Sequence, residues 1–170
     1  MEQTELFGVI CYAFLWLVYC GYNSYNTVNH ERQLKKLQEM ADNAHMYEII
    51  LQTLSPRAFM GLFVGAHLLV SAMELAGFAL AYAYISFNEF FLFAFTVILV
   101  SYIAQFTLEL RRIKKMGRIF SHSAHPFSVM ARYLRFQLNS SPWVYLSTYG
   151  KCFIALQLFL NLLQNPHPGF

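Results

Sequence analysis

The amino-acid sequence predicts an all-α integral membrane protein with four transmembrane helices. The chain is 57% hydrophobic and only 12% charged, whereas soluble domains average about 25% charged residues. Its apolar residues gather in four blocks, each long enough to cross a bilayer as a helix. The blocks lack the period-two alternation of membrane strands, and a helix satisfies its own backbone hydrogen bonds in lipid.

The first span is predicted over residues 6–22. Glu2 and Glu5 stand where a signal peptide carries basic residues, and no small-x-small cleavage site follows, so we expect this span to be retained. Residues 30–54 then place apolar side chains at spacings of three and four, the pattern of an amphipathic helix.

A serine–proline pair at 55–56 is a helix-start signal, because serine caps helices and proline suits the first helical position. It precedes the second span, predicted over 58–87. Only the short turn at 88–89 separates this span from the third, at 90–110. The second and third spans are therefore expected to form an antiparallel hairpin.

The connecting segment 111–141 is basic and contains no acidic residue. Residues 127–138 within it place apolar side chains on one side, which suits a helix lying in the membrane interface. A second serine–proline pair, at 141–142, introduces the fourth span, predicted over 143–163. The basic residues of the segment are Arg111, Arg112, Lys114, Lys115, Arg118, Arg132 and Arg135.

The positive charges predict how the chain is oriented. The segments after the first and third spans hold all but one of the twelve Lys and Arg residues, while the 88–89 turn and both termini hold none. The positive-inside rule therefore places residues 30–54 and 111–141 on the cytoplasmic side and both termini outside. We expect the whole chain, 1–170, to form one membrane domain. We expect contact with anionic lipid headgroups or an acidic partner on the cytoplasmic side. Nucleic-acid binding is not expected.

The second span carries an acid, Glu74, near its middle and an imidazole, His67, two turns earlier. A charge at the centre of a bilayer costs a few kcal/mol, so this face is expected to turn into the bundle. We expect the second span to be the most buried of the four. Its small residues expected to pack against other helices are Gly61, Gly65, Gly77 and Ala81.

Two interpretations of Glu74 remain open. In the first, the carboxyl group is a proton or cation site. In the second, which we favour, it is a neutral hydrogen-bonded acid or the partner of Lys151, and it only holds the helices together. Lys151 lies nine residues into the fourth span, so it either reaches toward Glu74 or extends to the cytoplasmic interface.

In the third span Ser101, Gln105 and Glu109 recur every four residues and form one polar stripe. With His67 and Lys151 this stripe would line a polar cavity near the cytoplasmic side. In the alternative that we favour, Glu109 lies at the interface and pairs with an arginine that follows it. Only Gln105 would then be buried.

No cofactor, metal site or catalytic residue is predicted. A bis-histidine haem that used His67 would need a second intramembrane histidine, which the chain lacks. The pair His122 and His125 has no nearby cysteine or carboxylate to complete a metal site. The three cysteines show no ligand spacing and are expected to be free thiols.

The sequence therefore favours a small, non-enzymatic membrane subunit that scaffolds, stabilises or helps assemble a larger membrane complex. The alternative is a proton- or ion-conducting component that uses Glu74, Lys151 and the polar stripe of the third span. A third hypothesis is a small membrane enzyme acting on lipids.

Overall fold

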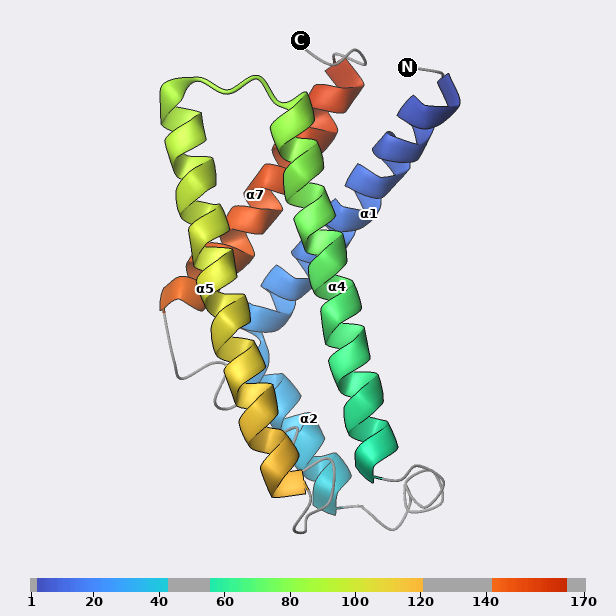
Figure 1. The fold of residues 1–170 in the computed structure, drawn as a ribbon, viewed down its shortest axis with the longest axis vertical. Helices are drawn as coiled ribbons and strands as arrows, with labels where there is room; N and C mark the ends of the chain where they lie inside the picture. The colour runs from blue at the N-terminus through green and yellow to red at the C-terminus, as the bar shows by residue number, and fades with distance from the viewer. Residues whose placement is uncertain (1–2, 43–55, 121–141, 165–170) are drawn as a thin grey trace.

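A computed structural model describes residues 3–42, 56–120 and 142–164, and this part of the chain is helical without strands (Figure 1). Four of its helices are long and apolar enough to cross a membrane, as predicted. By length and composition, the described part of the chain is that of an all-helical, multi-pass membrane protein. The helices are α1 (Gln3–Val28), α2 (His30–Asp42), α4 (Pro56–Tyr84), α5 (Glu89–Phe120) and α7 (Pro142–Gln164).

Two helices continue well past their predicted ends. The first extends beyond residue 22 to Val28, and α5 runs on through 110 to Phe120. Residues 111–120, the first ten of the predicted basic segment, are thus the end of α5. They do not belong to a separate segment after the helix, as the sequence predicted. Arginine and lysine are good helix formers, so a helix need not end where the apolar block ends. The rest of that segment, 121–141, lies outside the described residues.

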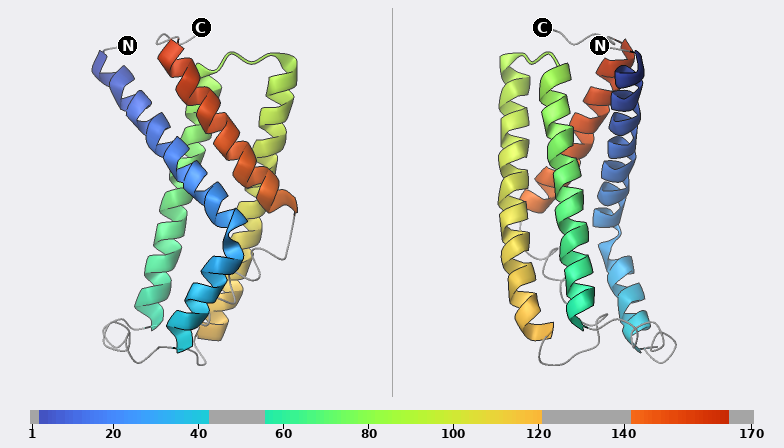
Figure 2. Two further views of the ribbon diagram at one scale, coloured as in Figure 1. Left: turned by 180° about the vertical axis from the view of Figure 1, so that it is seen from behind. Right: turned by 45° about the vertical axis from the view of Figure 1, so that its right-hand side comes forward.

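The predicted amphipathic helix is confirmed over α2, whereas 43–54 lie outside the described residues. Asn29 separates α1 from α2. Its backbone N–H and its side-chain amide both donate to the carbonyl oxygen of Tyr25, each at 3.0 Å. The side chain competes with the regular helical pattern at this point, and the chain changes direction there (Figure 2).

The predicted antiparallel hairpin of α4 and α5 is confirmed, with a short connection at residues 85–88. Asn88 begins α5 as its N-cap, because its Oδ1 accepts a hydrogen bond of 2.7 Å from the N–H of Phe91. This connection lies at the same end of the molecule as both chain termini (Figure 1). The basic end of α5 and the helix α2 lie at the opposite end.

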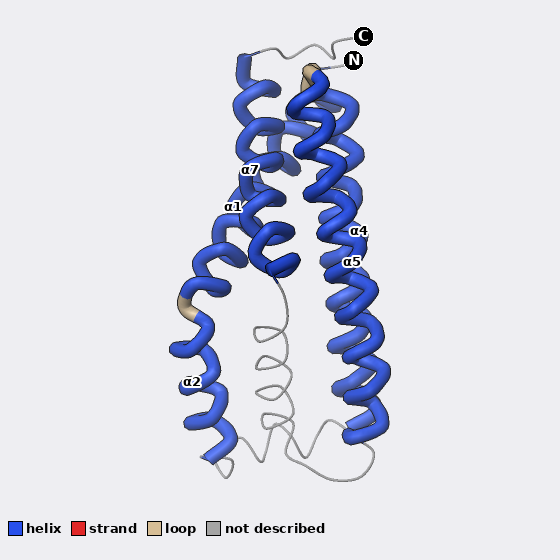
Figure 3. The backbone as a smooth tube through the Cα atoms, turned by 90° about the vertical axis from the view of Figure 1, so that its left-hand side faces the viewer, coloured by secondary structure: helices blue, strands red, loops and turns tan. Residues whose placement is uncertain are grey.

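The most buried helix is α7, not the second span. Of its apolar stretch 44% is buried, compared with 22% for α4 and 17% each for α1 and α5. Figure 3 shows α1 and α7 on one side of the bundle and the α4–α5 pair on the other. The reason for this burial is that α7 makes the two most extensive helix contacts, with α1 and with α5, and packs against α4 as well.

An apolar core fills the half of the bundle nearest the termini. Phe78 of α4 is at its centre and makes ring contacts with Trp16, Phe95 and Tyr102. The predicted packing role of Ala81 agrees with its complete burial there. The other fully buried members come from α1 and α7: Ala13, Ile154, Ala155 and Leu158.

Glycines allow two close approaches in this core. The ring of Trp16 lies so close to Gly77 that a Cβ there would overlap it, and a Cβ on Gly150 would lie 2.7 Å from two atoms of Ile98. Gly61 and Gly65 differ, because a Cβ at either would meet nothing within 4 Å. Neither glycine packs against another helix within the described residues, since both lie on the outer side of α4. Their role in helix packing stays a prediction.

The two kinds of glycine give a matched test of the packing. Gly77→Ala should destabilise the fold by roughly 1–3 kcal/mol, because the added methyl group overpacks against Trp16. Gly65→Ala should not destabilise it, since the methyl group enters open space and alanine favours helix. Denaturant titration of both variants in detergent measures this difference. Equal stability of the two variants would show that α1 and α4 do not approach as closely as described.

Candidate functional site

The inward faces of α4 and α7 change from polar to apolar part-way along each helix. Along α4 the inward positions run His67, Ser71 and Glu74 and then Phe78 and Ala81, so a polar half is followed by an apolar one. Along α7 the inward polar residues Thr148 and Lys151 are likewise followed by Ile154, Leu158 and Leu162. The polar halves meet in the part of the bundle farther from the termini.

At the boundary between the halves, Nζ of Lys151 donates a hydrogen bond to Oε1 of Glu74. Each residue is only 5% exposed. The ammonium also lies over the ring of Tyr102, 5.0 Å from its centroid, and the Tyr102 hydroxyl donates to the carbonyl oxygen of Ser71 at 3.2 Å. Of the two orientations left open for Lys151, the structure shows the one that reaches Glu74.

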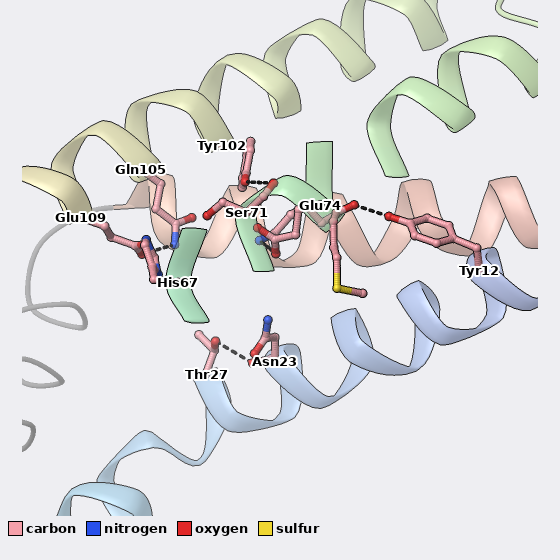
Figure 4. A network of polar contacts seen from close by, with 11 residues as sticks. Tyr12, Asn23, Thr27, His67, Ser71, Glu74, Tyr102, Gln105 and Glu109 are labelled. Atoms are coloured by element: carbon pink, nitrogen blue, oxygen red, sulfur yellow. Dashed lines mark hydrogen bonds and ion pairs between the residues drawn. The ribbon is translucent and has the colours of Figure 1, made fainter. Parts of the chain in front are cut away.

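A second polar cluster lies nearer the basic end of the bundle. Nε2 of Gln105 donates to Oε1 of Glu109 at 2.8 Å, and Nε2 of His67 lies 3.2 Å from the other carboxylate oxygen (Figure 4). The latter is an ion-pair distance without hydrogen-bond alignment. The imidazole ring stacks on Phe106, with centroids 5.9 Å apart.

Glu109 is only 6% exposed, so Gln105 is not the only buried residue of the stripe, contrary to the favoured alternative. The helix continues for eleven more residues, so Glu109 does not lie at its end. Ser101 also differs from the prediction. It is fully buried, but its hydroxyl donates at 2.7 Å to the carbonyl oxygen of Val97 in its own helix, and it does not line the cavity.

The two clusters line one cavity of 240 Å³ between the spanning helices and the start of α2. The predicted residues that meet there are His67, Glu74, Gln105, Glu109 and Lys151. The α1 side of the wall was not singled out from the sequence, although its polar residues recur at helical spacing. These additional wall residues are Tyr19, Asn23, Asn26 and Thr27.

The cavity does not continue across the bundle in the described part of the chain. Beyond Glu74 and Lys151, toward the termini, the apolar core fills the space between the helices. Within the described residues, no group of three or more His, Cys, Asp or Glu side chains is arranged to hold a metal ion. His122 and His125 lie outside those residues, as do Arg132 and Arg135.

The outer face of α4 has a different character. Glycine and alanine occupy exposed positions at helical spacing from Gly61 to Ala83, and larger apolar side chains such as Leu62, Leu69 and Met73 flank them. We call these positions the small-residue face. Its members are Gly61, Gly65, Ala72, Ala76, Ala79 and Ala83.

The basic end of the molecule exposes charges from two helices. Arg111 and Lys114 of α5 are exposed and Arg112 is partly exposed, while Lys115 and Arg118 occupy the following turns of the same helix. The exposed basic residues of α2 at this end are Arg32, Lys35 and Lys36.

Comparison of the chain with protein-family models, with curated proteins and with solved structures finds no match.

The buried ion pair gives a second test. Lys151→Met should lower the free energy of unfolding by roughly 3–5 kcal/mol, because Glu74 then remains buried without its lysine partner. The double variant Glu74→Gln with Lys151→Met should recover most of this loss, because neither charge remains. Denaturant titration in detergent of the wild type and the three variants of a double-mutant cycle measures the coupling. Additive single effects would show that the two groups do not interact.

Proposed function

We propose that this multi-pass membrane protein is a non-enzymatic subunit of a larger membrane complex, which receives a transmembrane helix of a partner on the small-residue face of α4. That face is the observation that supports the proposal. Lipid tails are as apolar as leucine, so helices in a membrane associate through close backbone packing rather than through the hydrophobic effect. Small residues in a row allow that packing.

The contrast with the rest of the surface strengthens this assignment. The lipid-exposed sides of the other spanning helices carry large side chains, among them Phe14, Phe93, Tyr149 and Phe153. Where glycine is used inside the protein, at Gly77 and Gly150, a neighbouring side chain already fills the space. The small-residue face alone combines length, small side chains and open space among the described residues.

The proposed orientation places the basic end in the cytoplasm and both termini outside. The exposed basic residues of α2 and α5 lie together at the end opposite the termini. Each basic residue near an anionic membrane surface contributes about 1 kcal/mol of attraction. Anionic headgroups are therefore the proposed contact of Arg111 and Lys114, and an acidic partner subunit is the alternative.

Ion conduction receives less support as the function of a single chain. The convergence of Glu74, Lys151, His67 and Glu109 on one cavity favours it. The apolar core between this cavity and the other end of the bundle argues against it, because an ion needs a polar path through the whole membrane.

A substitution on the small-residue face tests the proposed assembly. Gly65→Leu should reduce the amount of partner recovered with the chain by about tenfold, because one lost close contact costs about 1.4 kcal/mol or more. The fold should be unaffected, since a side chain at residue 65 enters open space. Quantitative purification from the native membrane in mild detergent measures the stoichiometry of the complex.

The matched control is Gly8→Leu, because Gly8 of α1 is also exposed and a Cβ there also meets nothing within 4 Å. This variant should retain the partner fully. A stoichiometric complex that survives Gly65→Leu, or a wild-type chain that leaves its native membrane without a partner, would contradict the proposal.

The orientation is tested by cysteine labelling in intact cells. Glu89→Cys, at the start of α5 near the termini, should react with a membrane-impermeant maleimide added outside. Lys36→Cys, on α2, should react only after the membrane is permeabilised. Both positions are exposed, so accessibility reports the side of the membrane. The reverse pattern would invert the proposed topology.

A further inference from the structure

The outward side of α4 follows a seven-residue repeat. The residues reached from 62 to 79 in alternating steps of three and four are all exposed and all apolar. Such steps define the a and d positions of a coiled coil, where two helices meet along one line. We call these positions the heptad seam. Its members are Leu62, Gly65, Leu69, Ala72, Ala76 and Ala79.

Large and small side chains alternate along the half of this seam nearer the basic end. Leu62 and Leu69 are 63% and 65% exposed, and Gly65 lies between them in open space, because a Cβ there would meet nothing within 4 Å. Ala72 and Ala79 continue the small positions at intervals of seven residues. The leucines are therefore knobs beside small positions that form holes, which is the surface that a second helix fills.

The repeat specifies the shape of the occupant. A straight α-helix has 3.6 residues per turn, so a seam with a seven-residue period winds slowly around the helix and favours a left-handed supercoil. Helices that pack in this way cross at about 20° and stay in contact along their length. The occupant is therefore a helix that runs beside α4, because a lipid tail has no fixed repeat to match the seam.

The heptad seam is complementary to itself. In a parallel pair of α4 helices related by a two-fold axis, each a position meets the same a position and each d position the same d position. Leu69 of one copy then enters the hole between Gly65 and Ala72 of the other copy, where the small residues leave room for it. The seam carries no polar or charged residue, so the pairing buries no unpaired polar group.

The parallel arrangement agrees with the proposed topology. Two copies of one chain enter the membrane in the same orientation under the positive-inside rule, so their α4 helices point the same way. Glu74 lies on the side of α4 away from the seam and stays paired with Lys151 within its own copy. The pairing of two copies therefore needs no change inside either bundle.

We infer that the occupant of the small-residue face is a second copy of this chain, held by a left-handed, parallel pairing of the two α4 helices along the heptad seam. This inference rests on the proposed use of that face for assembly, and it names the partner.

Cysteine cross-linking in the native membrane tests the pairing. Ala72→Cys and Ala79→Cys place thiols at d positions, which face each other across the two-fold axis. Oxidation with copper phenanthroline should link each variant into a disulfide-bonded pair of chains about tenfold more than the wild type, because paired thiols meet at a high effective concentration. The three native cysteines of the wild type give the background.

Val100→Cys is the matched control and should give only this background. Val100 is exposed on α5 near the depth of Ala72, because the hydroxyl of Tyr102 on α5 bonds to the neighbouring Ser71. Equal cross-linking of Val100→Cys and Ala72→Cys would overturn the inference, since random collision would then account for both.

A second pair of variants tests the close approach without an added thiol. Ala72→Leu should weaken the pairing of purified chains in detergent by about tenfold or more, because the larger side chain fills the hole that Leu69 enters. Val100→Leu should pair as the wild type does. Energy transfer between labelled copies measures both dissociation constants, and wild-type pairing of Ala72→Leu would overturn the inference.

The cross-links also separate this inference from the proposed assembly. A cross-link from Ala72→Cys to a different protein would overturn the second copy as occupant and would leave the proposed assembly standing. The absence of any cross-link at the seam, together with full retention of a partner by Gly65→Leu, would contradict both.

Discussion

The ion pair between Glu74 and Lys151 is the interaction on which the arrangement of the bundle depends. Neither charge is tolerated alone in the buried interior of the bundle, so α4 and α7 have to meet where Glu74 and Lys151 pair. α7 reaches that depth from a start part-way along the bundle and packs against the other three spanning helices. The central position of α7 therefore follows from the Glu74–Lys151 ion pair as well as from its packed apolar side chains.

The ion pair also lies at the boundary between the apolar core and the polar cavity. On the terminal side, inward side chains such as Trp16, Phe78 and Leu158 pack closely and exclude water. On the other side, inward side chains such as His67 and Gln105 are too polar and too loosely packed to close the space. The cavity is thus a direct consequence of where the inward-facing stripe changes from apolar to polar.

Much of this was readable from the sequence, because the length of an apolar block, the turn after the second span and the polar face of Glu74 are local patterns. The burial of Glu109 could not be predicted in this way, because it depends on His67 of another helix and on the continuation of α5 past the apolar block. The polar wall from α1 and the central position of α7 depend on how tilted helices pack. The periodicity of a single segment does not show how a helix is tilted or which helix the others pack around.

The inner and outer faces of α4 are linked through the helix itself. Glu74 follows Gly65 by nine residues, which is about two and a half turns, so the two lie on opposite sides of α4. The ion pair with Lys151 and the contact of Trp16 with Gly77 prevent α4 from rotating about its own axis. The small-residue face must therefore point away from the bundle whenever the ion pair forms. A polar contact inside one chain thereby sets the direction of the face that we propose receives a partner helix.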